Sequence, residues 1–540
     1  MSDPNTLSWE PPDAGEWDFD SAHQHTVLTA TAQAVMPESM AEGFKLAFGR
    51  LGLPLSHMAA QPVNGWLYLS AFVHGVPRKG NGKEPPGILI KLMSRIPPSA
   101  RKRIRIAQNA IDQRVAMAQV ERWEQGRNDF IEGNLALQDI DPAELSDDEL
   151  VAYLDATVSR GYEGMTLHFD LISQALPVGE YLLAIDDWGI DREVGAKAAF
   201  HSVPSTVESN ERLARIAAAL GDASITSLDD IRAHSPAAAA ALDDFLRHHG
   251  TRPLGDDYSV PNVCELPGAV LSLIEQARVE PIDEAAAIAA AVASCREQVG
   301  DADRHTFDRL LSDAQRAYAA LDDNSNVTAA WPGGLVRRAH LEAAGRLVDR
   351  GILPTADDVW ALTHTEIGGL LTGTDALTDA EIADRIAHRA ACAAATPPAH
   401  LGSPPSPDPD LSLFPAPVAK NTREMMAFIG AKFGDDTAIG IGEGAVTGRA
   451  VVARSADEAM ERIEPGDILV TSLTTPAYNG IMALLGGIVT ATGGPNGHTA
   501  IVARELGIPG VVGKADALDT IPDGATIQLD PAAATVSVVG

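Results

Sequence analysis

Apolar residues recur at helical spacing through the middle of the chain. From residue 99 to about residue 395 they return every three or four positions, as in the amphipathic run 335–350. Several helix starts there carry a hydroxyl side chain followed three positions later by a carboxylate, which is the capping-box pattern. This pattern begins at Ser146, Thr363 and Thr378. Because strand patterns are scarce, the sequence predicts a mainly α-helical N-terminal and central domain over residues 1–395.

The first hundred residues have a mixed pattern. Residues 1–20 are acidic and contain three prolines, which favours a loose segment. The apolar run from Trp66 to Val73 fits either a strand or a buried turn of helix. Both interpretations of this run stay open.

The pattern changes near residue 396. Residues 396–419 contain eight prolines, which predicts a stiff, extended linker that either lets a domain travel or is an inert spacer. After it, short apolar runs alternate with short helical ones, so residues 420–540 are predicted to form an α/β domain. The predicted strands lie at 448–453, 466–471, 510–513, 526–529 and 535–539.

Composition narrows the function classes. The chain has 540 residues and a formal net charge of −33, which argues against a nucleic-acid partner or an anionic membrane surface. Residues 1–20 lack the apolar core of a signal peptide, and no apolar run is long enough to cross a bilayer. The three cysteines have no metal-binding spacing and suggest a reducing compartment. These observations predict a soluble, cytoplasmic protein.

One stretch near the C-terminus predicts a strand, a tight turn and a helix in close succession. The apolar run 487–490 looks like a buried strand, residues 493–497 form a glycine-rich turn, and residues 499–506 have a helical pattern. Gly507 stands where a helix usually ends. The glycine-rich turn is therefore followed directly by the start of the helix.

His498 is placed by this pattern in the first turn of the short helix. Free backbone N–H groups and the helix dipole favour an anion at such a position. A neutral imidazole there can accept a phosphoryl group, so His498 is the candidate catalytic residue; a buried structural histidine is the alternative. The candidate phosphate-binding residues are Gly493, Gly494, Gly497 and Thr492.

The same stretch resembles a known family pattern of a Gly-Gly pair, a histidine, and a helix that reads Ala-Arg-Glu-Leu-Gly-Ile-Pro. The matching residues are Gly493, Gly494, His498, the run Ala503 to Pro509, and Gly513. The stretch is similar to the phosphohistidine swivelling, or mobile, domain of the phosphoenolpyruvate-utilising enzymes, and most like the rifampin phosphotransferase and phenylphosphate synthase types. The family often has Thr and then Ser or Cys before the histidine, whereas this chain has Asn496 and Gly497, so control by threonine phosphorylation is not implied.

Two helical segments also resemble this family, at 245–257 and at 337–363. The resemblance implies that the helical domain binds a small-molecule substrate. Arginine can hold a carboxylate or phosphate through two parallel hydrogen bonds, and histidine can act as a general base; structural ion pairs and core histidines are the alternatives. The candidate substrate-binding residues are Arg252, His248, His249, His168 and Arg337.

The resemblance implies a phosphotransferase of the dikinase type with a phosphohistidine intermediate. Relatives carry an ATP-grasp nucleotide domain, but no segment of suitable length and no Walker-type loop is found in this sequence. We therefore expect a separate ATP-grasp subunit to charge His498 from ATP, with Mg²⁺ entering alongside the nucleotide and protein ligands for the metal left undefined. The acceptor would be a hydroxyl or enol of a small organic substrate.

Two other functions fit the same sequence. In the first, phosphoenolpyruvate supplied by a barrel subunit is the donor in place of ATP. In the second, the chain is a non-catalytic phosphocarrier whose helical domain senses a ligand. Substrate identity and oligomeric state are not indicated by any residue pattern.

Overall fold

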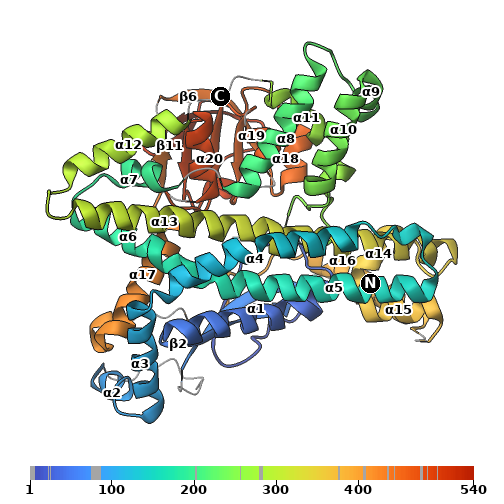
Figure 1. Ribbon diagram of the computed structural model, residues 1–540. Helices are drawn as coiled ribbons and strands as arrows, with labels where there is room; N and C mark the ends of the chain where they lie inside the picture. Colours follow the sequence, from blue (N-terminus) through green and yellow to red (C-terminus); the bar gives the residue numbers. More distant parts are fainter. Residues whose placement is uncertain are drawn as a thin grey trace. The chain divides into compact units, whose positions relative to one another are not determined.

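The computed structural model describes most of the chain in two compact units. The residues outside the description are 1–6, 22–23, 25, 75–86, 201–202, 256, 279–283, 375–376, 405–408, 434–436, 443, 475–477, 483, 496 and 540. The first unit comprises Met1–Ser173, Asp256–Val260 and Asn324–Arg423, and the second comprises Gln174–Gly255, Pro261–Asp323 and Glu424–Gly540. The predicted fold class is confirmed: the chain is mainly helical, with an α/β region at its C-terminal end (Figure 1).

The first unit is built on long helices with the predicted caps. Ser146, Thr363 and Thr378 each form the reciprocal capping box that the sequence predicts. The helices of this unit are α1 (Ala30–Leu51), α2 (Gly87–Met93), α3 (Pro98–Asp112), α4 (Val115–Gln138), α5 (Asp147–Asp170), α14 (Trp331–Asp349), α15 (His364–Thr372) and α16 (Asp379–Ala393).

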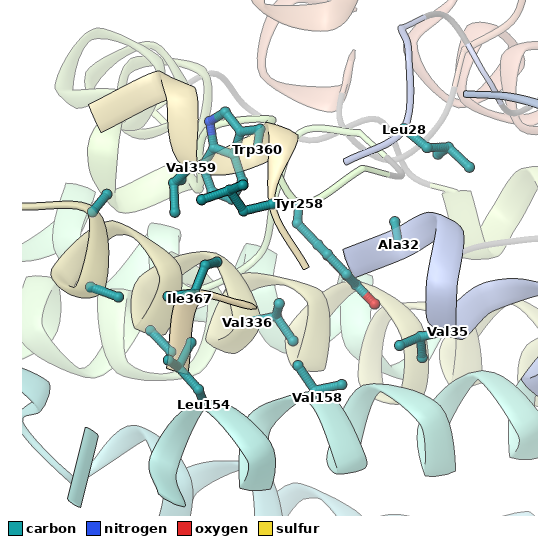
Figure 2. Packing of buried hydrophobic residues seen from close by; sticks show 14 of the residues in the cluster. Leu28, Ala32, Val35, Leu154, Val158, Tyr258, Val336, Val359, Trp360 and Ile367 are labelled. Atoms are coloured by element: carbon teal, nitrogen blue, oxygen red, sulfur yellow. The ribbon is translucent and has the colours of Figure 1, made fainter. Parts of the chain in front are cut away.

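The core of the first unit lies where α1, α5 and α14 pack together. Figure 2 shows Leu154 and Val158 of α5 beside Val336 of α14, with Val35 of α1 nearby. Tyr258, from a short segment far away in the sequence, packs into the same cluster. Burial of such side chains contributes about 1.5–3 kcal/mol each, so this apolar cluster stabilises the unit strongly.

A small antiparallel sheet completes the first unit. Its order is β2-β3-β1-β4, with β1 at Glu16–Phe19, β2 at Leu55–Val63, β3 at Trp66–Val73 and β4 at His400–Gly402. The run from Trp66 to Val73, which the sequence left open, is therefore a strand. Asn64 and Gly65 connect β2 to β3 with positive φ angles of 51° and 75°, the conformation that a two-residue hairpin turn requires.

Over its described residues, the proline-rich segment 396–419 is not the extended linker that its composition predicts. β4 within it pairs with β1, which gives this stretch backbone hydrogen bonds that a free polyproline segment lacks. Helix α17 (Ala416–Phe433) begins before the segment ends. Proline restricts φ but is tolerated at strand edges and at helix starts, so a high proline content alone does not define a linker.

The second unit holds a helical part from the middle of the chain and the predicted α/β region. Residues 424–433, the last part of α17, also belong to this unit. Its other helices are α6 (Ala175–Asp187), α7 (Arg192–Ala199), α8 (Pro204–Leu220), α9 (Leu228–His234), α10 (Pro236–Phe245), α11 (Pro267–Gln276), α12 (Glu284–Gln298), α13 (Arg304–Asn324), α18 (Ala456–Arg462), α19 (Asn479–Met482), α20 (His498–Leu506) and α21 (Ala517–Thr520).

A seven-stranded sheet of order β11-β10-β6-β7-β8-β9-β5 forms the centre of the α/β region. Its strands are β5 (Ile439–Ile441), β6 (Val446–Val452), β7 (Ile468–Thr471), β8 (Gly487–Thr490), β9 (Gly510–Val512), β10 (Thr526–Asp530) and β11 (Thr535–Val538). All the predicted strands are present, and β5 is an addition. In Figure 1 the labels β6, β11 and α20 lie together in the orange-to-red part of the ribbon.

The four central strands β6, β7, β8 and β9 run parallel. Every residue of β7 and β8 is buried, as expected for parallel strands covered on both faces. Their carboxyl ends meet at one edge of the sheet, where ligands bind in many open α/β sheets. The loop that follows β8 leads from this edge into α20.

Membrane-spanning helices were sought over the described part of the chain. None of the helices there is long and apolar enough to cross a bilayer.

Candidate functional site

The loop between β8 and α20 depends on glycine for its shape. Gly493 has a φ of +123°, a backbone conformation that residues with a Cβ rarely adopt. The Gly494 N–H donates to the Lys432 carbonyl at 3.0 Å, and the Gly497 N–H donates to the Gly494 carbonyl at 3.1 Å. A Cβ on Gly497 would lie 2.9 Å from the Lys432 carbonyl oxygen. The loop is therefore packed backbone against backbone onto the end of α17.

His498 is the first residue of α20, and Gly497 at the N-cap supplies no side-chain cap. The positive end of the helix dipole lies at this helix start, next to the imidazole. The hydroxyl of Thr474 lies 3.0 Å from His498 Nδ1 and 2.7 Å from the hydroxyl of Thr499. The Thr474 hydroxyl thus engages Nδ1 and orients the ring.

The environment keeps the His498 imidazole neutral. The pKa of His498 is lowered to about 3, mainly by burial and also by the positive charge of Lys432, against a smaller opposing effect of a hydrogen bond with the Thr474 main chain. At neutral pH the ring therefore carries a lone pair in place of a second proton. A neutral imidazole is the form that acts as a nucleophile.

Two further ionisable groups accompany this histidine. Burial lowers the pKa of Lys432, and the charge of Asp322 on α13 opposes that shift. Burial raises the pKa of Asp322, opposed by Lys432 and reinforced by the neighbouring Asp323. The Asp323 carboxylate accepts a hydrogen bond from the Ser205 N–H at 2.9 Å. Lys432 and Asp322 were not predicted from the pattern around His498, because they lie on helices α17 and α13, well before the glycine-rich loop.

Arg504 on α20 contacts the glycine-rich loop through the Pro495 carbonyl. Its Nη1 donates to the Pro495 carbonyl at 2.6 Å, and its Nε lies 3.7 Å from a carboxylate oxygen of Glu193 on α7. Burial lowers the pKa of Arg504, opposed by Glu193. Arg504 therefore fixes the glycine-rich turn relative to the helix that carries His498.

The predicted phosphate-binding residues Gly493, Gly494 and Gly497 all lie in this loop. Thr492 precedes them, and its hydroxyl donates to the Ser472 carbonyl at 3.0 Å, so it ties the loop to the end of β7. Thr474, which contacts His498, was not singled out from the sequence. The available signal was its position just after a buried parallel strand, next to the strand that leads to the histidine.

Three of the predicted substrate-binding residues lie close in sequence in the second unit. His248 and His249 are in a π-helical turn at Leu246–Gly250. His248 Nδ1 lies 2.9 Å from the Asp244 carbonyl, and His249 is buried with its ring stacked on Phe245 at 5.4 Å. The Arg252 carbonyl accepts the Val263 N–H at 2.9 Å.

The other two predicted substrate-binding residues lie in the first unit. His168 Nδ1 is 2.8 Å from the Asn324 side-chain oxygen. Arg337 is buried, donates to the Ser259 carbonyl at 2.6 Å, and places its guanidinium 5.4 Å from the centre of the Trp360 ring. The five residues therefore belong to two different units, and their proposed shared role in substrate binding stays a prediction.

Metal-binding groups were also sought. The described residues contain no group of three or more His, Cys, Asp or Glu side chains that could hold a metal ion. These residues therefore do not form a Mg²⁺ site.

Comparison with known proteins identifies the class of the C-terminal region. Residues 463–533 match the family described as PEP-utilising enzyme, mobile domain. The chain therefore carries a mobile domain of the phosphoenolpyruvate-utilising enzymes, and the resemblance drawn from the His498 stretch is confirmed. The matched residues include the glycine-rich loop, His498 and α20.

Individual relatives extend this match beyond the mobile domain. The chain is 29% identical over 324 residues, 54% of its length, to a rifampicin phosphotransferase of Streptomyces sp. It is 28% identical over 244 residues, 44% of its length, to the uncharacterised phosphotransferase YvkC of Bacillus subtilis. It is 46% identical over 87 residues, 16% of its length, to a phosphoenolpyruvate synthase of Aeropyrum pernix.

The matched segments cover only part of these relatives. They span 33% of the rifampicin phosphotransferase, 27% of YvkC and 11% of the phosphoenolpyruvate synthase. Phosphotransferases are thus among the proteins that the chain resembles, over a third of their length or less.

Proposed function

We propose that the chain is a phosphotransferase that carries a phosphoryl group on Nε2 of His498 and delivers it to a hydroxyl or enol of a small organic substrate. One observation carries the proposal: a neutral histidine begins α20 directly after a glycine-rich loop, with Nδ1 held by Thr474. The phosphotransferase relatives, which match the chain outside the mobile domain as well, support the same class of reaction.

The proposed charging step uses ATP. Nε2 becomes bonded to the β-phosphorus as the bond from that phosphorus to the oxygen retained by AMP breaks, and water cleaves the bond between the β- and γ-phosphoryl groups. Histidine, ATP and water thus give phosphohistidine, AMP and inorganic phosphate. The start of α20, with the positive end of its helix dipole, stabilises the negative charge that arrives. We further propose that a separate ATP-grasp subunit binds the nucleotide, and that Mg²⁺ accompanies ATP on that subunit.

The proposed delivery step regenerates the histidine. The substrate oxygen forms a bond to phosphorus, the N–P bond to His498 breaks, the hydroxyl proton passes to a base, and the imidazole is left neutral. Splitting the transfer through a covalent histidine replaces one difficult step by two easier ones. The proposed substrate-binding residues are the five named above, and the proposed location is the cytoplasm, without nucleic-acid or membrane partners.

The test is intact-mass analysis of the purified full chain after incubation with phosphoramidate, a small phosphoryl donor that needs no enzyme. The chain would then be incubated with ATP, alone and with a candidate ATP-grasp subunit. With ATP and the subunit we expect an acid-labile gain of one phosphoryl group on the wild type and none on His498→Gln. With phosphoramidate, which also labels exposed histidines, we expect the wild type to gain one group more than His498→Gln.

His305→Gln is the matched control, because His305 is exposed on α13 of the same unit. Equal labelling of the wild type and His498→Gln would contradict the proposal. Charging by ATP without a partner would place the nucleotide site on this chain, and charging by phosphoenolpyruvate in place of ATP would change the donor.

A further inference from the structure

The surface of α2 exposes many apolar side chains. None of its seven residues, Gly87 to Met93, is buried. Five of the thirteen large apolar side chains that are exposed in the described part of the chain lie in or just after this helix: Ile88, Leu89, Leu92, Met93 and Ile96. Ile88 is 74% exposed. Because contact of such a patch with water costs free energy, the patch is typical of a surface that another molecule covers.

The end of α2 is fixed to the rest of the first unit. Arg95, just after the helix, donates from Nη1 to the Leu413 carbonyl at 2.5 Å and from Nη2 to the Phe414 carbonyl at 3.0 Å. The Ser94 hydroxyl donates to the Leu413 carbonyl at 3.2 Å. All four residues belong to the first unit. The apolar patch is therefore a defined surface of this unit.

Basic side chains accompany the apolar patch. Residues 87–111 contain six Lys and Arg residues and no Asp or Glu, whereas the whole chain has a formal net charge of −33. Of these six residues, Lys91, Arg101, Lys102 and Arg105 are exposed. We name residues 87–105 the basic end. Positive charge beside an exposed apolar patch favours a partner surface that is apolar and acidic.

A surface of that kind lies at the far end of α4 in the same unit. α4 has 24 residues and is about 36 Å long; α3 precedes it, and residues 139–149 follow it (Figure 1). These eleven residues contain six Asp and Glu residues and no Lys or Arg. Asp147 is held in ion pairs within its own unit, whereas Glu144 and Asp148 are exposed and Ile140 is 38% exposed. We name residues 139–149 the acidic end.

We propose that the basic end binds the acidic end of a second copy of this chain, in a two-fold dimer whose two α4 helices run antiparallel. Each basic end then meets the acidic end of the other copy, so the same contact is made twice and the assembly closes. The apolar patch around Ile88 lies against the surface that carries Ile140, with opposite charges beside it. A parallel pair would bring like charges together. This inference does not depend on the proposed function of His498.

The test is sedimentation velocity of the full chain over a range of concentrations. We expect a dimer at about 10 µM that dissociates as NaCl rises from about 50 mM to about 500 mM, because salt screens charges at the rim of the contact. Ile88→Ser should weaken the dimer by about tenfold or more, since the lost apolar contact occurs twice. Val207→Ser is the matched control, because Val207 is 42% exposed on α8 of the second unit.

Charge reversal tests which surfaces meet. The double variant Arg101→Glu, Lys102→Glu reverses the basic end, and the double variant Glu144→Lys, Asp148→Lys reverses the acidic end. Each variant alone should be monomeric, because like charges then face each other in both contacts. An equimolar mixture of the two variants should form a dimer, since both contacts of the mixed pair again join opposite charges.

The control for charge reversal is Lys197→Glu, Arg454→Glu, at two exposed positions of the second unit, which should dimerise as the wild type does. Thermal melts followed by circular dichroism confirm that each variant is folded. Three results would overturn the inference: a wild type that stays monomeric up to about 100 µM, assembly beyond a dimer, or folded charge-reversed variants whose mixture stays monomeric. Loss of the dimer in the basic-end variant alone would also overturn it, because the partner surface would then not be the acidic end.

Discussion

The hydroxyl of Thr474 bridges Nδ1 of His498, at 3.0 Å, and the hydroxyl of Thr499, at 2.7 Å. Thr474 follows β7, whereas the other two residues begin α20 after the adjacent parallel strand β8. The ring is therefore oriented by the loop of a neighbouring strand. The parallel pairing of β7 and β8 thus brings Thr474 next to His498 and aligns its ring.

Thr474→Val tests this alignment. Valine keeps the volume but removes the hydroxyl, so the ring loses its partner at Nδ1. We expect phosphorylation of His498 by phosphoramidate to fall by roughly tenfold, the effect of one lost hydrogen bond of about 1 kcal/mol or slightly more. Thr520→Val is the control, because its hydroxyl donates to the Asp516 carbonyl just before α21, in the same region. Equal phosphorylation rates in the two variants would show that the Thr474 hydroxyl does not align His498.

Gly497→Ala tests the close packing of the loop on α17. The added Cβ would stand 2.9 Å from the Lys432 carbonyl oxygen, a main-chain atom that moves only with the helix. We expect the free energy of unfolding to fall by about 1–3 kcal/mol, as for other overpacked sites. The measurement is urea denaturation.

Gly430→Ala, on α17 itself, is the matched control for that substitution. Nothing lies within 4 Å of a Cβ at Gly430, so alanine there should stabilise the helix by roughly 0.5–1 kcal/mol. A Gly497→Ala protein as stable as the control would show that the loop can move away from α17.

The sequence predicted the strand–turn–helix around His498 because every local signal there agrees. A buried apolar run, glycines in a turn, and a C-terminal Gly507 with a φ of 67° each specify one element. The first sheet was harder to predict from the same kinds of signal. β4 is three residues long and is separated from its partner β1 by most of the first unit, so only tertiary contact defines it.

The candidate site was predictable only where it is local in sequence. His498 and its loop are contiguous, and their resemblance to a known pattern identified them. Lys432, Asp322 and Glu193 lie on three helices that are distant in sequence from His498. Charged residues are common on the surfaces of helices, so their presence alone does not indicate a site. Their relation to the histidine depends on how the second unit packs, which spacing alone does not reveal.

The pH dependence of labelling tests the neutrality of the imidazole. Since the pKa of His498 is lowered to about 3, the neutral form persists well below pH 6.5. We expect the intrinsic phosphorylation rate to stay nearly flat from pH 8 to pH 5, after correction for protonation of the donor. A free histidine peptide, measured in parallel, should lose activity below pH 6.5. A fall in the protein near pH 6.5 would show that the ring is more accessible to water than its burial implies.

The same depressed pKa affects stability in a defined direction. In the unfolded chain the histidine binds a proton near pH 6.5, whereas the folded state resists protonation down to about pH 3. The contribution of His498 is therefore fully present above pH 6.5 and is lost as the pH falls toward 3. We expect His498→Gln to lose less stability than wild type over this interval in parallel urea titrations at pH 7 and pH 5.

Arg504→Met tests whether the glycine-rich turn is braced from α20. Methionine fills much of the same volume but donates no hydrogen bond, which leaves the Pro495 carbonyl without its 2.6 Å partner. We expect faster hydrogen exchange of the loop amides from Thr492 to His498, slower phosphorylation, and a loss of about 1–3 kcal/mol in stability. Glu193→Gln should have a smaller effect, at most about 1 kcal/mol, because Glu193 is 53% exposed and lies 3.7 Å from Nε. If Glu193→Gln loosened the loop as much as Arg504→Met, the ion pair with α7, and not the hydrogen bond to Pro495, would be the contact that holds the loop in place.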